Sequence, residues 1–399
     1  MDGPPIRNGA VLIGADGRIE AVGAQGDVPR PADAESSEWP DAVILPGLVN
    51  THTHLELTGF AGMADEDAFP AWIRRIRALK AERSAADFLA AARQGLADCH
   101  AAGVTTVADT GDSGAVLEAL AEVGGSGISY HEVFGPHPGQ LAESMAGLRQ
   151  RIADLRHFAS ERVLLGVSPH APYTVSAELY RAVAEFAGRE GLPIAVHLAE
   201  SAAETELVTG GAGPFAEAWR LRGIPLPAAA GASPVAWLDA HGVLGERTLA
   251  IHLVRAHGED LSRLRRSGTA VAHCPLSNRR HGHGAAPLSA FLEAGLSVGV
   301  GTDSVASVGR LDLLAEARAA RALAGLSAEA ALSLVTTGAA RALGLGGAVG
   351  ALRPGLWGDA AVVRMEGREL PGSPFEAILA SSPADVAETI LGGRTVYRG

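Results

Sequence analysis

Residues 46–60, PGLVNTHTHLELTGF, contain a short pattern that could bind a metal ion. His52 and His54 follow an apolar run and stand two positions apart, and Glu56 comes two residues after them. On a β-strand, residues i and i+2 share a face, so both imidazoles can point toward one ion. The alternative is that the two histidines form only the polar end of a buried strand.

Polar residues that could complete a metal site end several later apolar runs. They are His170, His197 with Glu200, His252, His273 and Asp303. A single histidine at a strand end is more often a hydrogen-bonded structural residue than a ligand. Added to the first two histidines, however, a third histidine and a carboxylate make a ligand set that suits Zn²⁺, Fe²⁺ or a similar ion. The set predicts one bound divalent metal ion.

Eight apolar runs of β-strand character carry these polar ends. They span residues 43–52, 104–109, 128–133, 163–170, 193–200, 248–254, 269–275 and 296–304. Helical stretches such as 85–103 and 177–191 fall between most of them. This alternation predicts an α/β chain folded as a (β/α)8 TIM barrel, in which the carboxyl ends of the strands surround one active-site mouth. The alternative is an open doubly wound sheet, but no Gly-x-Gly-x-x-Gly stands where a dinucleotide-binding turn would need it.

Both ends of the chain have the pattern of short β-strands. AVLIGADGRIEAVG, residues 10–23, holds an Asp-Gly turn between two apolar runs, which is typical of a hairpin. Residues 350–365 and 388–399 show short strand patterns separated by Gly and Pro. We therefore predict a small β-sandwich domain built from residues 1–45 and 346–399, and a catalytic barrel domain over residues 46–345.

Composition narrows the classes of partner. The formal net charge of -12 argues against nucleic acid or an anionic membrane, because phosphate binding needs a basic face. The first residues, MDGPPIRNGA, lack the pattern of a signal peptide, and no apolar run approaches the roughly 20 residues of a membrane helix. The two cysteines, Cys99 and Cys274, lie too far apart to suggest a disulfide scaffold. We expect a cytoplasmic protein that acts on a small molecule.

Six of the motifs, in this order, resemble the strand-end motifs of the amidohydrolase superfamily. They are PGLVNTHTHLE (46–56), HAPYTVS (170–176), HLAES (197–201), AIHLV (250–254), HCPLSN (273–278) and GTDS (301–304). The resemblance covers nearly the whole chain and is strongest to the branch of cytosine, guanine and adenosine-type deaminases and chlorohydrolases. It implies a metal-dependent hydrolytic deaminase with the same barrel and split β domain, and a possible homodimer.

The resemblance also implies roles for individual residues. Those that match the family's metal ligands are His52, His54, His197 and Asp303. His252 matches a histidine that lies beside the metal-bound water and in some relatives is itself a ligand. In the implied mechanism, the metal activates a water molecule and Asp303 takes its proton. Glu200 passes protons to a ring nitrogen and to the departing ammonia.

The only lysine of the chain, Lys80, bears on the number of metal ions. Binuclear members of the superfamily bridge two metals with a carboxylated lysine at the end of the fourth barrel strand. Here that strand ends with SPHAPYT (168–174), and Lys80 lies in a helical segment far from any predicted strand end. We therefore expect one metal ion, zinc or iron, and no lysine-bridged pair.

Candidate substrate-binding residues lie on loops after the same strands. They are Glu56, Trp72, His170, Arg279, Arg280 and His281. We expect Glu56 to hydrogen-bond the substrate's ring or ribose, and the two arginines to hold a carboxylate, which a guanidinium can grip with two hydrogen bonds. Alternatively, Arg279 and Arg280 are solvated loop residues and Trp72 is ordinary helix packing.

Three motifs bear on the substrate: HTHLE, the helix FPAWIRR and the loop NRRHGHG. They look most like those of the aminodeoxyfutalosine deaminases of menaquinone biosynthesis. The implied substrate is 6-amino-6-deoxyfutalosine, which offers an adenine to deaminate and a benzoate that an arginine could hold. The alternatives are adenosine, methylthioadenosine, S-adenosylhomocysteine, a guanine- or pterin-type ring, or a cyclic amide such as an imidazolone that is opened without loss of ammonia.

Overall fold

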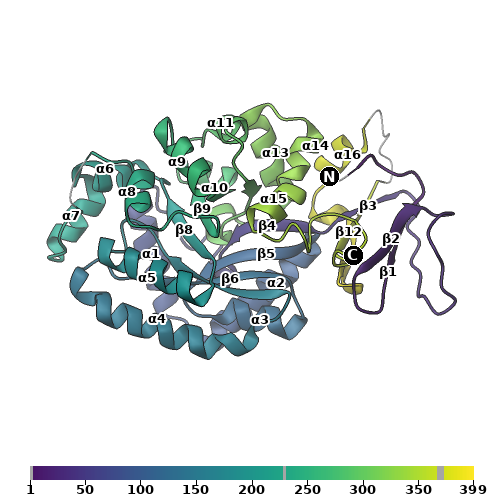
Figure 1. Ribbon diagram of the computed structural model, residues 1–399, viewed down its shortest axis with the longest axis horizontal. Helices are drawn as coiled ribbons and strands as arrows, with labels where there is room; N and C mark the ends of the chain where they lie inside the picture. Colours follow the sequence, from purple (N-terminus) through teal and green to yellow (C-terminus); the bar gives the residue numbers. More distant parts are fainter. Residues whose placement is uncertain (1–2, 228–230, 366–372) are drawn as a thin grey trace.

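A closed barrel of eight parallel strands forms the centre of the molecule (Figure 1). The computed structural model describes residues 3–227, 231–365 and 373–399. The strand order is β11-β10-β9-β8-β7-β6-β5-β4. The strands are β4 (Leu48–Thr53), β5 (Val104–Gly111), β6 (Gly127–Val133), β7 (Val163–Pro169), β8 (Ile194–Leu198), β9 (Thr248–His252), β10 (Ala270–His273) and β11 (Val298–Val300). A parallel bridge between Thr53 and Asp303 links the chain just after β11 to β4. The predicted barrel is thus confirmed, and the open sheet is excluded.

Helices follow most of the barrel strands and cover the sheet from outside (Figure 1). In the first half they are α1 (Phe69–Ala81), α2 (Ala85–Ala101), α3 (Ala115–Val123), α4 (Leu141–Leu155), α5 (Ala177–Glu190), α6 (Ala202–Gly210), α7 (Gly213–Leu221) and α8 (Pro234–Ala240). In the second half they are α9 (Glu259–Ser267), α10 (Pro275–Arg280), α11 (Leu288–Glu293), α12 (Val305–Val308), α13 (Leu313–Ala324), α14 (Ala328–Ser333), α15 (Thr337–Ala342) and α16 (Pro374–Leu379). Single 3-10 turns span Leu55–Leu57, Pro138–Gln140, Arg156–Phe158 and Pro383–Asp385.

Local sequence explains where these helices begin and end. Helix α2 begins with a capping box, in which the Ser84 hydroxyl accepts from Asp87 N and the Asp87 carboxylate accepts from Ser84 N. Helix α5 begins at a simple N-cap, Ser176, whose hydroxyl accepts from Leu179 N at 3.3 Å. It ends at Gly191, whose φ of 70° is the left-handed conformation that favours glycine.

The barrel strands are buried on both faces, which explains their continuous apolar character. Leu48 and Val49 are neighbours on β4, yet they belong to two different apolar clusters. Successive side chains of a strand point to opposite faces. The cluster of Leu48 includes Leu96 of α2, whereas the cluster of Val49 joins Ile128 and Leu249 of other barrel strands. The strands therefore pack against the helices on one side and against each other on the other.

The two ends of the chain meet in a second, antiparallel sheet. Its order is β14-β13-β12-β3. The strands are β3 (Ala42–Pro46), β12 (Ala360–Arg364), β13 (Val386–Leu391) and β14 (Arg394–Arg398), and a separate hairpin joins β1 (Gly9–Ile13) to β2 (Ile19–Ala24). Figure 1 shows these purple and yellow segments side by side at one end of the molecule. The predicted small β part from both termini is confirmed, while its bounds at residues 45 and 346 stay a prediction.

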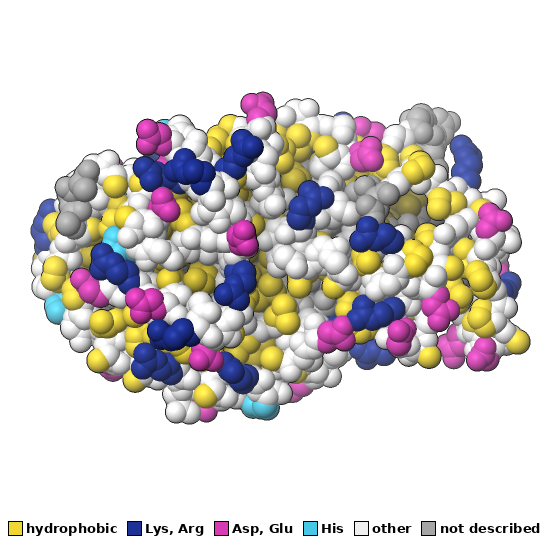
Figure 2. Space-filling model, viewed as in Figure 1, with side chains coloured by type: hydrophobic (Ala, Val, Ile, Leu, Met, Phe, Trp, Pro, Cys, Tyr) yellow, Lys and Arg dark blue, Asp and Glu magenta, His cyan; other side chains and the backbone are white. Residues whose placement is uncertain are grey.

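Charge on the face drawn in Figure 2 is mixed. Lys and Arg side chains lie scattered among Asp and Glu side chains, and they do not gather into one basic surface there. Within the described ranges, no helix is both long enough and apolar enough to cross a membrane.

Candidate metal and catalytic site

Four predicted metal ligands meet at the carboxyl ends of three barrel strands. His52 lies on β4 and His54 just after it, His197 lies on β8, and Asp303 follows β11. The Nε2 atoms of His52 and His54 each lie 3.6 Å from Asp303 Oδ1, and the Nε2 atoms of His54 and His197 are 3.3 Å apart. A tetrahedral zinc ion with bonds of about 2.0–2.1 Å would hold ligand atoms roughly 3.3 Å apart. The donor set and its spacing therefore fit one divalent metal ion.

Two further observations support a metal at this cluster. His52 is 1% exposed, and neither of its ring nitrogens has a hydrogen-bond partner among the described residues. Burial and the nearby His52 lower the pKa of His54 to about 3, so this imidazole is neutral and its lone pair is free to bind a metal. Buried nitrogens without partners are costly, and a bound cation would satisfy them.

The backbone and its neighbours fix the carboxylate of Asp303. Its Oδ2 accepts a hydrogen bond from the Ser277 hydroxyl at 2.5 Å, and its Oδ1 accepts from Ser304 N at 2.7 Å. Asp303 has a φ of 62°, a left-handed conformation that is strained for residues other than glycine. Burial alone would raise the pKa of Asp303, but the charges of the surrounding histidines, His52 foremost, hold it well below the usual value. The carboxylate is therefore ionised and aimed into the cluster.

Glu200 lies beside the cluster but is not one of its four candidate metal ligands. Its Oε1 is 3.3 Å from His283 Nε2 and 3.6 Å from His252 Nε2. Burial alone would raise the pKa of Glu200, yet these two histidines lower it to about 2. His252 in turn donates from Nδ1 to Asn278 Oδ1 at 3.0 Å, which leaves its Nε2 facing Glu200. The arrangement offers an ionised carboxylate and a neighbouring imidazole that can exchange a proton.

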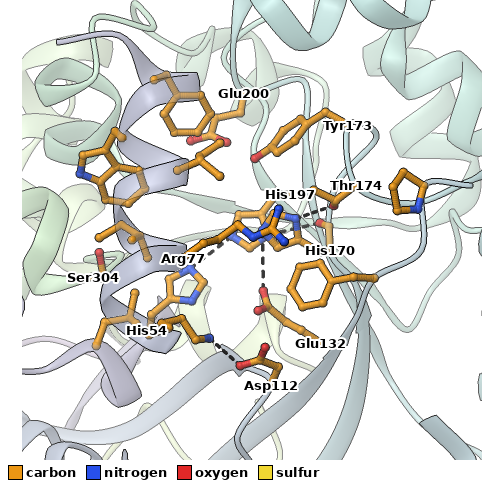
Figure 3. Close-up of a pocket in the computed structure, with 18 of the residues that line it drawn as sticks. His54, Arg77, Asp112, Glu132, His170, Tyr173, Thr174, His197, Glu200 and Ser304 are labelled. Carbon is orange, nitrogen blue, oxygen red and sulfur yellow. Dashed lines mark hydrogen bonds and ion pairs between the residues drawn. The ribbon is translucent and has the colours of Figure 1, made fainter. Parts of the chain in front are cut away.

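The cluster opens into a cavity of about 540 Å³, a size typical of a small-molecule site (Figure 3). Helix α1 forms one wall. Its residues Phe69, Trp72, Ile76 and Lys80 stand three or four positions apart, so they share one helix face, and all line the cavity. The wall is thus apolar and aromatic at the N-terminal end of α1 and cationic at its C-terminal end.

Three predicted substrate-binding residues line this cavity: Trp72, His170 and His281. The rings of Trp72 and His281 are 4.5 Å apart, in edge-to-face contact. His170 lies deeper, with its ring 4.8 Å from that of His197.

The structure places Glu56 elsewhere than expected. The side chain is 2% exposed and does not line the cavity. Its carboxylate forms an ion pair with Lys80 and accepts a hydrogen bond from Ser113 N at 3.1 Å. Glu56 faces α1 because the chain after β4 turns into a 3-10 helix at Leu55–Leu57. Its contacts are structural, so the expected substrate contact has no support.

Arg279 and Arg280 also depart from the expectation. Both are exposed at the end of α10, and neither lines the cavity. Arg280 approaches Asp65 at 4.0 Å instead. The short helix α10 turns Ser277 and Asn278 inward, where both are buried, and the two arginines that follow face solvent.

Lys80 reaches the mouth of the barrel, although its position in the sequence suggested otherwise. Its ammonium lies 2.5 Å from Asp112 Oδ1, which follows β5. Burial alone would lower the pKa of Lys80, but Glu56 and Asp112 together raise it above the usual value. A lysine must lose its proton before it can be carboxylated, and the residue after β7, the fourth strand, is His170. A lysine bridge between two metals therefore remains excluded.

Sequence patterns missed several cavity-lining residues, among them Arg77, Asp112, Glu132 and Tyr173. Arg77 stands four positions after Ile73 and three before Lys80, which also line the cavity, so its place on their helix face follows only once the orientation of α1 is known. Glu132 sits inside the strand-like run ISYHEV, where no pattern distinguishes it from a buried structural residue.

Comparison with known proteins agrees with this geometry. The amidohydrolase family matches residues 43–396. A 5-methylthioadenosine/S-adenosylhomocysteine deaminase of Symbiobacterium thermophilum is 31% identical over 98% of this chain and 89% of its own length. An aminodeoxyfutalosine deaminase of Deinococcus radiodurans is 32% identical over 86% of this chain and 83% of its own.

A solved structure gives the same picture. An adenosine deaminase from Xanthomonas campestris with bound zinc superimposes with a TM-score of 0.86, at 26% identity, over 97% of this chain and 88% of its own. The matches support a hydrolase that acts on C–N bonds other than peptide bonds. Since the family match spans barrel, metal cluster and terminal sheet together, the chain belongs to the amidohydrolase family.

Proposed function

We propose that this protein is a metal-dependent deaminase of a 6-aminopurine nucleoside, which it converts to the oxo compound with release of ammonia. The observation that carries the proposal is the position of Glu200. It lines the cavity beside the metal cluster, with its Oε1 within 3.6 Å of His252 Nε2, and so can move protons at a ring held there. The curated relatives are named as nucleoside deaminases, in agreement with this chemistry.

The proposed mechanism divides the work among the residues of the site. His52, His54, His197 and Asp303 would hold a divalent metal ion, zinc or iron, which when bound makes water a nucleophile near neutral pH. Glu200, ionised in the free protein, accepts a proton and delivers it to the ring nitrogen next to the amino carbon, and later to the leaving amine. His252, held by Asn278 through its Nδ1, keeps its Nε2 directed at Glu200 and the cluster.

For the substrate itself we propose 6-amino-6-deoxyfutalosine, and with it a place in menaquinone biosynthesis. One support is the Deinococcus radiodurans relative, which is named an aminodeoxyfutalosine deaminase. The other is Arg77 of α1, which lines the cavity and has neither an ion pair nor a hydrogen bond to a described residue. Figure 3 shows Arg77 reaching across the cavity toward His170. Arg77 therefore replaces Arg279 and Arg280 as the candidate partner of the substrate's benzoate.

The competing substrates differ in what they leave behind. Adenosine, methylthioadenosine, S-adenosylhomocysteine and 6-amino-6-deoxyfutalosine would each release ammonia with a change in ultraviolet absorbance. A guanine- or pterin-type ring would release ammonia with a different spectral change, and a cyclic amide would open without ammonia.

The test is a panel of these compounds with the zinc- and iron-loaded enzyme, with ammonia measured alongside the absorbance. The proposal expects ammonia from the 6-aminopurine nucleosides, with the highest kcat/KM for 6-amino-6-deoxyfutalosine. If no 6-aminopurine nucleoside releases ammonia, the proposed reaction is wrong. If the neutral nucleosides are preferred, only the proposed substrate is wrong.

A further inference from the structure

Two imidazoles flank the carboxylate of Glu200, and the mechanism proposed above uses only one of them. Glu200 Oε1 lies 3.6 Å from His252 Nε2 and 3.3 Å from His283 Nε2. His283 stands in the loop between α10 and α11. Its side chain is 4% exposed and does not line the cavity, and it belongs to none of the metal-binding groups found among the described residues. His283 can therefore influence the reaction only through Glu200.

Of the two imidazoles, only His283 can donate a hydrogen bond to Glu200 while it is neutral. His252 donates from Nδ1 to Asn278 Oδ1, so its Nε2 holds a lone pair. The ionised carboxylate of Glu200 only accepts, so the hydrogen between Glu200 and His283 must sit on His283 Nε2. This nitrogen is buried, and no described residue forms a well-aligned hydrogen bond with it. Hydrogen bonds of this kind are often long or poorly aligned before a ligand binds and tighten afterwards.

The loop around His283 fixes the direction of its side chain. The His283 N–H donates to Asn278 O at 3.0 Å, so Asn278 holds one imidazole by its side chain and the other by its backbone. Gly282 and Gly284, on either side, have φ values of 66° and 105°, in the left-handed region that favours glycine. The ring of Phe69, at the start of α1, packs edge-on against that of His283, with centroids 4.5 Å apart. The imidazole is thus held by its own backbone and by α1.

The backbone of Glu200 is also held, whereas its side chain depends on the two imidazoles. The Glu204 carboxylate accepts hydrogen bonds from Ala199 N at 2.7 Å and from Glu200 N at 2.9 Å. Both ion-pair contacts of Glu200 within the described ranges use Oε1, and the one with His283 is the shorter. This contact is therefore the one that can keep the carboxylate from turning about its side-chain bonds.

Packing alone does not explain an imidazole at position 283. A buried nitrogen that carries a hydrogen and lacks an acceptor is costly. An apolar side chain would pack against Phe69 without that cost. The polar atom of His283 is therefore explained by the carboxylate that it faces.

We propose that His283 is a positioning residue, whose Nε2–H holds Oε1 of Glu200 and keeps Oε2 directed at the ring in the cavity. This rests on the proposed function, in which Glu200 carries protons to that ring. The two histidines then have separate tasks. His252 lies on the side of the metal cluster, with its ring 5.6 Å from that of His52, and exchanges protons. His283 lies on the side of α1 and sets the orientation of the carboxylate.

The experiment compares His283→Gln with His283→Asn and His283→Leu, using adenosine and the zinc-loaded enzyme. The amide nitrogen of glutamine reaches the place of Nε2, whereas that of asparagine reaches only the place of Nδ1. His283→Asn and His283→Leu should lower kcat by about 10- to 100-fold, which corresponds to the loss of one hydrogen bond to a charged group. Their KM and metal content should stay nearly unchanged. His283→Gln restores the donor and should stay within about threefold of the wild type.

His241 provides the matched control. It is a buried histidine outside the cavity, and its Nδ1 lies 2.5 Å from Trp237 O in the adjoining helix α8. His241→Leu also replaces a buried imidazole by an apolar side chain, so it should turn over as the wild type does.

A double variant tests whether His283 acts through Glu200. Glu200→Gln/His283→Leu should turn over no more slowly than Glu200→Gln alone, since the carboxylate that His283 holds is already absent. If the two losses multiply instead, His283 supports the fold or the site independently, and the proposal is wrong.

Three further results would overturn the proposal. They are wild-type turnover in His283→Leu, equal losses in His283→Gln and His283→Asn, and loss of metal in all three variants. If the wild type does not deaminate adenosine, crystal structures of zinc-loaded wild type and His283→Leu decide about His283 separately from the reaction. We expect Glu200 Oε1 within about 3.2 Å of His283 Nε2 in the wild type and another Glu200 rotamer in the variant. The same Glu200 rotamer in both would refute the positioning role.

Discussion

Glu56 and Lys80 form an ion pair that joins the 3-10 turn after β4 to the C-terminal end of α1. The same ammonium also reaches Asp112 after β5, at 2.5 Å. One lysine therefore connects the segments that follow the first two barrel strands to the helix that forms a wall of the cavity. The residue that looked like a substrate contact in the sequence is part of the frame that holds this wall.

Replacing Lys80 by methionine should lower the free energy of unfolding by about 2–3 kcal/mol. Loss of one partner of a buried pair costs about 3–5 kcal/mol, and the 20% exposure of Lys80 reduces that figure. Urea denaturation of the wild type, Lys80→Met and the double variant Glu56→Gln/Lys80→Met measures the effect. The double variant should lose less stability than Lys80→Met, since no ionised Glu56 is left buried. Equal midpoints for all three proteins would show that the pair contributes nothing.

Glu200→Gln should keep the metal and lose turnover. The amide cannot accept and deliver the proton, so kcat should fall by about 10²- to 10⁴-fold. Metal analysis of the purified variant and steady-state kinetics with its best nucleoside measure the two effects separately. Glu143→Gln, on the exposed face of α4, is the control and should behave as the wild type. Turnover near that of the wild type in Glu200→Gln would disprove the proton-transfer role.

His197 and His170 lie next to each other but should respond differently to substitution. His197→Ala removes a metal ligand and should reduce bound metal at least about tenfold. His170→Ala should leave metal content unchanged and raise KM. Elemental analysis and titration with a chelator distinguish the two. Stripping the metal from the wild type should also lower Tm, because an ion that binds only the folded state stabilises it by about 4 kcal/mol at a thousandfold excess over Kd. Metal loss in His170→Ala would contradict the assignment.

Arg77 should decide the preference for an acidic substrate tail. Arg77→Gln should reduce kcat/KM for a nucleoside with a carboxylate on its 5′ substituent by about tenfold and leave that for its methyl ester nearly unchanged. Arg74→Gln changes the same residue type three positions earlier; both arginines are exposed, but only Arg77 lines the cavity. In Arg74→Gln, the ratio of kcat/KM for the acid to kcat/KM for the ester should be that of the wild type. A similar loss in both variants would mean that general charge, and not a contact, is responsible.

His100 should make the folded state sensitive to acid. Burial lowers the pKa of His100 from 6.5 to about 4. The unfolded chain therefore binds this proton more readily, so stability is complete above about pH 6.5 and falls as the pH drops toward 4. This pKa shift corresponds to about 3 kcal/mol of unfolding free energy, since each pKa unit is worth about 1.4 kcal/mol. Denaturation of the wild type, His100→Gln and His257→Gln at several pH values measures it. His257 is exposed, and only His100→Gln should flatten the pH profile.

The barrel and its metal cluster were predictable from the sequence for physical reasons. Parallel strands buried on both faces are continuous apolar runs, and their carboxyl ends meet at one mouth. A polar residue at the end of such a run, like His197 or Asp303, must therefore lie near the others. Because His52 and His54 stand two positions apart on a strand, the sequence also predicted that their side chains point to the same face.

The substrate-facing residues were harder to predict, because they depend on how loops and helices turn. Glu56 stands two positions after a metal ligand, yet the 3-10 turn points it toward α1. Arg279 and Arg280 follow a buried segment, but the short helix α10 directs them to solvent. To predict that Arg77 lines the cavity, one must know the orientation of α1. To predict the same of Glu132, one must know how β6 pairs with its neighbours. Neither follows from local sequence spacing alone.

The pairing of β3 with β12 also constrains the order in which the molecule can be completed. Pro46 lies two residues before the first residue of the first barrel strand, and its partner is Ala360, more than 300 positions later in the sequence. During synthesis the N-terminal segment emerges first, so β3 must wait with unpaired backbone groups until almost all of the chain has been made. An unpaired strand edge invites pairing with other chains. The strand that leads toward the metal site thus stays open to misassembly until β12, far along the chain, pairs with it.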